Sequence, residues 1–92
     1  MLIIQDEVFK INHLKIIEYI ALDSKRKAKN FNSMLLNTIK NLPNMPFKFR
    51  KSYYFNDANV RDLIFKGYTI PYLIDESSHK IVLLDIFKWS ER

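Results

Sequence analysis

The first half of the chain has hydrophobic positions that follow the period of an α-helix. From residue 7 to about residue 22 they recur on one side of a 3.6-residue helix, and Asp6 is placed to cap its first turn. A second helical pattern begins after Ser24 and ends at Pro43, which cannot continue a helix. Because the break between the patterns is short, we expect an αα-hairpin whose apolar stripe covers a sheet. The stripe consists of Phe9, Ile16, Ile17, Ile20, Ala21, Ala28, Phe31, Leu35, Ile39 and Leu42.

Strand patterns dominate the rest of the chain. Residues 2–5 form a short β-branched run, and residues 60–66 and 68–74 alternate around Gly67, the single glycine of the sequence. This arrangement predicts an antiparallel hairpin. Residues 80–87 give the strongest strand signal. Pro71 conflicts with a regular strand, because proline lacks the N–H of a sheet ladder and usually marks an edge or a bulge.

Between the helices and the hairpin, residues 47–55 alternate aromatic with basic side chains, which predicts an extended connector pinned to the core by its aromatics. The elements together predict an α+β fold of order β-α-α-β-β-β, in which an αα-hairpin packs on a small, mainly antiparallel four-stranded sheet. With 92 residues the chain has room for one core, and we expect a single domain over residues 1–92.

Charge is distributed unevenly along the sequence. No acidic residue lies between Asp23 and Asp57, and the other residues carry seven basic against ten acidic side chains. Such a field attracts polyanions or an acidic protein partner. The alternative is a solvated cationic face that only aids solubility. The eight basic residues of the stretch are Lys25, Arg26, Lys27, Lys29, Lys40, Lys48, Arg50 and Lys51.

Several classes of site are excluded by composition. The absence of cysteine removes disulfides, thiol nucleophiles and Cys-based zinc sites, and it is typical of an intracellular protein. The sequence shows no signal peptide or membrane segment, so we expect a cytoplasmic location. A single glycine provides no phosphate-binding loop, and His13 and His79 do not form a metal motif. We therefore expect no metal and no small-molecule cofactor.

Cationic and aromatic side chains are the remaining source of chemistry. A metal-independent nuclease can clamp a phosphate with arginine and lysine and use a tyrosine, histidine, glutamate or lysine for proton transfer. The candidates are Arg61, Lys66, Lys88 and Arg92, with Tyr68 or Tyr72 as the proton-transfer group and Trp89 as a stacking platform for a base.

The order and spacing of Arg61-x-Leu63 and of Gly67-Tyr68-x-Ile70-x-Tyr72 resemble the RelE/ParE superfamily of bacterial toxins from type II toxin-antitoxin systems. The likeness covers nearly the whole chain, including the helical run 17–23, the exit 42–46 and the strand 81–87. It implies the fold given above, growth inhibition and neutralisation by a cognate antitoxin. Antitoxin or target contacts are then expected at Lys25, Lys29, Lys40, Lys48, Arg50, Lys51 and Trp89.

The superfamily has two main targets, DNA gyrase and mRNA on the ribosome. Ribonuclease members carry an arginine directly after the Gly-Tyr pair, and ParE-type members commonly do so as well, whereas this chain has Thr69 there. Arg61-Asp62-Leu63 is similar to the Arg-acid-Leu of ParE-type members, which favours a non-catalytic gyrase inhibitor. A ribosome-dependent endoribonuclease and a basic adaptor for protein or nucleic acid are the alternatives.

Overall fold

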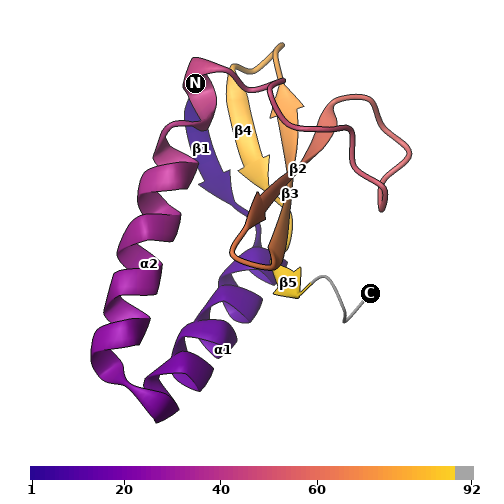
Figure 1. Cartoon of the computed structure of the whole chain (residues 1–92). Helices are drawn as coiled ribbons and strands as arrows, with labels where there is room; N and C mark the ends of the chain where they lie inside the picture. Colours follow the sequence, from indigo (N-terminus) through magenta and orange to yellow (C-terminus); the bar gives the residue numbers. More distant parts are fainter. Residues whose placement is uncertain (89–92) are drawn as a thin grey trace.

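The computed structural model describes residues 1–88, and its elements follow the predicted order (Figure 1). Two helices come between the first strand and the hairpin, and a short second segment of strand is added at the end. The elements are β1 (Leu2–Gln5), α1 (Glu7–Asp23), α2 (Lys25–Lys40), the 3-10 turn η1 (Leu42–Asn44), β2 (Val60–Phe65), β3 (Tyr68–Asp75), β4 (Lys80–Leu83) and β5 (Phe87–Lys88).

Both predicted helix caps are confirmed. Asp6 Oδ2 accepts the N–H of Val8 at 2.9 Å, and Ser24 Oγ accepts the N–H of Lys27 at 3.2 Å. The Ser24 N–H also donates to the Ile20 carbonyl at 3.0 Å, so this one residue closes α1 and opens α2. The helices consequently form an antiparallel hairpin on one side of the sheet (Figure 1).

The sheet has the strand order β1-β4-β3-β2. β5 pairs with Tyr68 and Thr69 at the start of β3, before the residues of β3 that pair with β4. β1 runs parallel to β4, whereas the other pairings are antiparallel. The helix-facing side of the sheet forms the core with the inner faces of the helices. The buried cluster contains Phe9, Leu35, Ile39, Leu42, Leu63, Tyr68, Ile70, Tyr72, Ile74, Ile81, Leu83 and Ile86.

The predicted continuous strand over residues 80–87 is wrong in one respect, because the structure divides it into β4 and β5. The interruption lies beside Pro71, whose carbonyl oxygen faces it and accepts the N–H of Leu84 at 2.9 Å. On an antiparallel strand the N and O of one residue point to the same neighbour. The missing donor of Pro71 therefore faces the gap between β4 and β5, where no ladder bond is required.

The hairpin between β2 and β3 turns through Lys66 and Gly67, which have φ values of 48° and 84°. Positive φ at both central residues is the geometry of a type I′ turn, which matches the twist of the flanking strands. The hairpin predicted at Gly67 is confirmed.

The connector comprises residues 45–59 and runs along the edge of β2. Phe49 packs against the core cluster, and the ring of Tyr54 meets that of Phe87 edge-on at 5.1 Å between centroids. Tyr53, by contrast, is 72% exposed. Two of the connector aromatics thus pin it, as predicted, while Tyr53 does not. Within residues 1–88, neither helix is long and apolar enough to cross a membrane.

Candidate binding site

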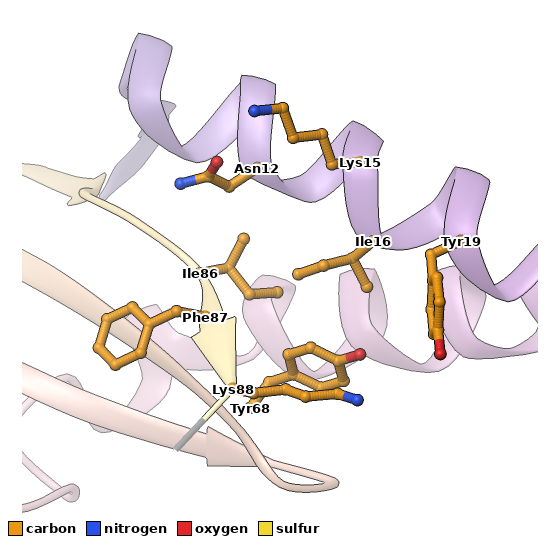
Figure 2. Close-up of a pocket in the computed structure, with 8 residues that line it drawn as sticks. All are labelled: Asn12, Lys15, Ile16, Tyr19, Tyr68, Ile86, Phe87 and Lys88. Atoms are coloured by element: carbon orange, nitrogen blue, oxygen red, sulfur yellow. The ribbon is translucent and has the colours of Figure 1, made fainter. Parts of the chain in front are cut away.

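A cleft of about 390 Å³ lies between α1 and the sheet edge at the start of β3 and the end of β5 (Figure 2). One wall comes from α1 and the other from the last described residues of the chain, with Tyr68 at the floor. The lining residues are Asn12, Lys15, Ile16, Tyr19, Tyr68, Ile86, Phe87 and Lys88.

A polar contact between distant parts of the chain fixes the width of this cleft. Asn12 Nδ2 on α1 donates to Asp85 Oδ1 at 2.7 Å, and the backbone N–H of Ile86 donates to the same oxygen at 2.7 Å. The Asp85 side chain is buried. Because Asp85 lies in the link between β4 and β5, the interruption of the strand provides the anchor for α1.

The cationic side of the cleft is organised by two tyrosine rings. Lys88 pairs directly with Tyr68 in the β3–β5 register. Its Nζ lies 6.0 Å from the centroid of the Tyr68 ring and 5.7 Å from that of the Tyr19 ring, within the range of cation–π attraction. Lys15 on α1 also lines the cleft, and its ammonium group points away from that of Lys88 (Figure 2).

Among the described residues that line the cleft, none carries a carboxylate. The polar lining consists of two lysines, two tyrosines and an asparagine, and the apolar lining consists of Ile16, Ile86 and Phe87. Such a site attracts an anionic group and accommodates an apolar body attached to it.

Arg61, the first predicted catalytic residue, points to the connector instead of this cleft. Its Nη1 donates to the carbonyl oxygens of Phe47 at 3.2 Å and Phe49 at 3.0 Å, and its Nε donates to that of Ala58 at 3.3 Å. The guanidinium also lies 4.9 Å from the centroid of the Phe47 ring. Arg61 therefore fastens the connector to β2.

The other predicted catalytic groups are not gathered around Arg61. Lys66 lies in the hairpin turn, five residues further along the chain and thus roughly 16 Å away along the strand. Its Nζ lies 3.7 Å from Met34 Sδ on α2. Lys88 is in the cleft, and Arg92 lies outside the described residues. Arg61 therefore lies apart from Lys66, whereas Lys66 and Lys88 lie at the same end of the sheet, next to Tyr68.

Tyr72, one of the two tyrosines considered for proton transfer, is fully buried, and its hydroxyl donates to the Pro46 carbonyl at 2.6 Å. Burial raises the pKa of the Tyr72 phenol to about 12, with Arg61 lowering it and Asp62 raising it by smaller amounts. A phenol held in this way is unsuited to proton transfer near neutral pH. Tyr68 is the tyrosine of the pair that borders a cleft.

The residues predicted to contact a partner fall into two groups. Lys25, Lys29 and Lys40 are exposed on α2, and Lys48 is exposed with its Nζ 5.5 Å from the Phe49 ring centroid. Arg50 and Lys51 instead lie where the connector meets β2, and Arg50 is paired with the carboxylate of Asp62 on that strand. Trp89 lies outside the described residues.

The buried carboxylate of Asp62 on β2 contacts two residues of the connector, Arg50 and Tyr53. Asp62 is 0% exposed, and its Oδ2 lies 3.4 Å from Arg50 Nη2 and accepts the Tyr53 N–H at 3.2 Å. The Arg50 guanidinium also covers the Tyr53 ring, 3.9 Å from its centroid, and the backbone of Lys51 forms an isolated antiparallel β-bridge with that of Arg61. Arg50 is therefore held in the structure by these contacts.

Sequence reasoning missed Asn12, Lys15 and Tyr19 as members of a site. A signal was available, because Lys15 and Tyr19 are four residues apart and must share a side of the helix. The approach of Tyr19 to Lys88 depends on how α1 packs on the sheet, which no local pattern reports.

The order of the elements and the mixed sheet agree with the fold that the resemblance to the RelE/ParE superfamily implies. Residues 7–92 match the family model described as the ParE toxin of the type II toxin-antitoxin system, parDE, and the chain belongs to this family. It is accordingly the toxin component of a type II system, whose partner is an antitoxin.

A solved structure described as the chromosomal ParDE toxin-antitoxin system from P. aeruginosa has a similar fold. The TM-score is 0.74 at 16% sequence identity, and the match covers 96% of this chain and 95% of the other. A search of curated protein sequences found no match.

Proposed function

We propose that this toxin stops growth by binding DNA gyrase, without a chemical step of its own, and that its cognate antitoxin neutralises it by binding in turn. The observation that carries the proposal is that the Arg61 guanidinium donates hydrogen bonds to three carbonyl oxygens of the connector. A strand arginine held in this way is not poised to clamp a scissile phosphate.

The environment of Thr69 argues against the cleavage of RNA. This residue stands where ribonuclease members of the superfamily carry an arginine, and it is 0% exposed. Its position on β3 opposite Ile64 and Phe87 places it inside the sheet. A side chain at this position is poorly placed to meet RNA.

The experiment is controlled expression of the toxin in a bacterium that carries a reporter plasmid. We expect growth arrest accompanied by loss of negative supercoiling in the plasmid and by a DNA-damage response, while translated transcripts stay uncut. Uninduced cells provide the control. Fresh cuts in translated mRNA with normal plasmid supercoiling would contradict the proposal.

A second candidate function, cleavage of mRNA on the ribosome, is favoured by one observation. Tyr68 and Lys88 border the same cleft, which would place a phenol near a phosphate-binding ammonium group. Tyr68→Phe and Lys88→Ala separate the two functions, because a nuclease that uses these groups would lose cleavage by orders of magnitude. Arg61→Ala is the weaker test, since it also releases the connector.

A further inference from the structure

The connector has an unusual composition where it approaches the edge of β2. Within residues 47–55, every residue except Ser52 is aromatic or basic, and none is acidic or aliphatic. Connecting loops are usually built from glycine, proline and small polar residues, because these favour turns. Alternation of aromatic and basic side chains is instead typical of surfaces that bind nucleic acid. We call residues 47–55 the aromatic-basic segment.

The aromatic-basic segment is both accessible and firmly attached. Figure 1 shows the connector projecting beyond the β2 edge of the sheet, away from α1 and α2. Two backbone hydrogen bonds join it to this edge. The Ser52 N–H donates to the Val60 carbonyl at 2.9 Å, and the Asp62 N–H donates to the Arg50 carbonyl at 3.1 Å. None of its residues lines the cleft beside α1, so it forms a separate surface.

Tyr53 is the most exposed aromatic residue of the segment. It is 72% exposed, against 38% for Phe47 and Phe55. Its position is nevertheless defined, because the Arg50 guanidinium lies 3.9 Å from the ring centroid and the Tyr53 N–H donates to the buried Asp62 carboxylate at 3.2 Å. An exposed ring held in this way offers a flat surface on which an unpaired base can stack.

Two lysines of the segment can attract phosphate groups. Lys48 and Lys51 are exposed, and within residues 1–88 neither forms an ion pair with a carboxylate. Arg50 differs, because the Asp62 carboxylate at 3.4 Å balances its charge. Asp57, the one acidic residue of the connector, lies two positions beyond the segment. The lysines therefore supply the net positive charge, and Arg50 supports the Tyr53 ring.

Lys51 and the Tyr53 ring lie on opposite faces of the sheet at its β2 edge. Lys51 pairs with Arg61, which stands opposite the core residue Tyr72, so Lys51 lies on the helix side. Tyr53 lies with Asp62, the next residue of β2, whose side chain points to the other face. A single strand is flexible enough to cross this edge, whereas a DNA duplex is stiff over about 150 base pairs.

From this arrangement we infer that the aromatic-basic segment binds a single strand of nucleic acid. An unpaired base stacks on the Tyr53 ring, and neighbouring phosphates contact Lys48 and Lys51. DNA and RNA share this chemistry, so both bind alike. A protein partner fits less well, because the segment offers no aliphatic side chain and lysine is depleted in protein interfaces. The inference involves no cleavage and does not depend on the gyrase target.

The probe for the test is a fluorescent thymidine oligonucleotide of about 12 nucleotides, a length within the range of single-strand sites. Binding to the full chain is measured by anisotropy at several salt concentrations between about 0.05 and 0.2 M. Three comparison ligands of equal length separate the contributions. They are a phosphate–sugar strand without bases, a uridine RNA, and a duplex of the thymidine strand with its adenosine complement.

We expect the thymidine strand to bind in the micromolar range at the lowest salt concentration. The strand without bases should bind at least about tenfold more weakly, because it offers nothing to stack on the ring. The duplex should bind more weakly than the single strand, since its bases are already paired and stacked. The uridine RNA should bind within about fivefold of the thymidine strand, because no contact depends on the sugar.

Variants at Tyr53 separate stacking from other contributions. Tyr53→Phe retains the ring and should bind the thymidine strand within about twofold of the parent, whereas Tyr53→Leu should bind at least about fivefold more weakly. Both changes are at an exposed position and keep the backbone hydrogen bond to Asp62. Circular dichroism checks that both variants are folded.

Variants at the lysines test the phosphate contacts. Each phosphate contact on a single strand contributes about 0.7 to the slope of log K against log salt concentration. Lys48→Ala combined with Lys51→Ala should therefore reduce this slope by about 1.4. The matched control is Lys25→Ala with Lys29→Ala on α2, which removes the same charge and should leave the slope unchanged.

Several results would overturn the inference. Absence of binding at about 100 μM protein and low salt would do so, as would equal affinity for strands with and without bases. Equal binding by Tyr53→Phe and Tyr53→Leu would remove the stacking platform. A duplex that binds as tightly as the single strand, or a preference for DNA or RNA greater than about fivefold, would contradict the proposed contacts. An equal loss of slope in both lysine pairs would show that the attraction is not local to the segment.

Discussion

Arg61 Nη1 donates a hydrogen bond to the carbonyl oxygen of Phe49 at 3.0 Å, which ties a strand residue to a connector residue twelve positions earlier. Phe49 in turn packs against the core, and its ring meets that of Tyr72 edge-on at 6.5 Å. The contact links the edge of the sheet to the connector that covers it.

Arg61→Ala should destabilise the protein because three backbone carbonyls lose a charged donor. We expect the free energy of unfolding to fall by about 2–3 kcal/mol, measured by urea denaturation. Arg26→Ala, at an exposed position of α2, is the control and should stay within about 0.5 kcal/mol of the parent. An unchanged stability of Arg61→Ala would show that the connector does not depend on this side chain.

Stability at alkaline pH should report on Tyr72. Its folded pKa, about 12, lies above the ordinary value of 10.0, so above pH 10 the unfolded state releases this proton first. Stability from this group is therefore complete below pH 10 and declines between pH 10 and 12, by up to about 1.4 kcal/mol per pH unit. Tyr72→Phe should remove this part of the decline in pH-dependent denaturation. An identical alkaline profile in the parent and Tyr72→Phe would contradict the assignment.

The turn between β2 and β3 should respond in opposite directions at its two central residues. Gly67→Ala places a Cβ at φ 84° and should cost about 1–2 kcal/mol. Lys66→Asn introduces a residue that tolerates positive φ, so it should raise stability by less than about 1 kcal/mol. Thermal unfolding checks both changes. A Gly67→Ala variant that is as stable as the parent would argue against the type I′ turn.

The basic face of α2 should govern the speed of encounter with the antitoxin. Charge reversal at Lys25, Lys29 and Lys40 is expected to slow association at low salt, with little change in the dissociation rate. Stopped-flow or surface binding measurements at two salt concentrations separate these rates. Association that is independent of both salt and the reversed charges would show that this face is only solvated.

Local sequence signals predicted the elements whose stability is decided locally. Asp6 and Ser24 identified the helix starts, and Gly67 identified the hairpin. Each of these residues acts on its own backbone neighbours, so its effect is visible in a short window. The conflict noted at Pro71 was also real, and it is resolved by the interruption between β4 and β5.

The candidate site was less accessible to sequence reasoning because it depends on long-range packing. Arg61 was predicted to be catalytic because the sequence does not show its hydrogen-bond acceptors. These are the carbonyl oxygens of Phe47 and Phe49, and their positions depend on the path of the connector. The sequence analysis did not identify the exposed apolar residues of α1, such as Ile11 and Leu22. The residues of α1 that face the core are enough by themselves to produce the helical period. Tyr19 and Lys88 meet only when α1 has packed on the sheet.

The central claim, that this ParE-family toxin acts by binding gyrase, is tested most directly with purified components. Relaxed plasmid, ATP and gyrase are incubated with increasing amounts of the toxin, and supercoiling is read on a gel. The account predicts that supercoiling stops as the toxin approaches stoichiometric excess over gyrase. Undiminished supercoiling at a saturating concentration of folded toxin would contradict it.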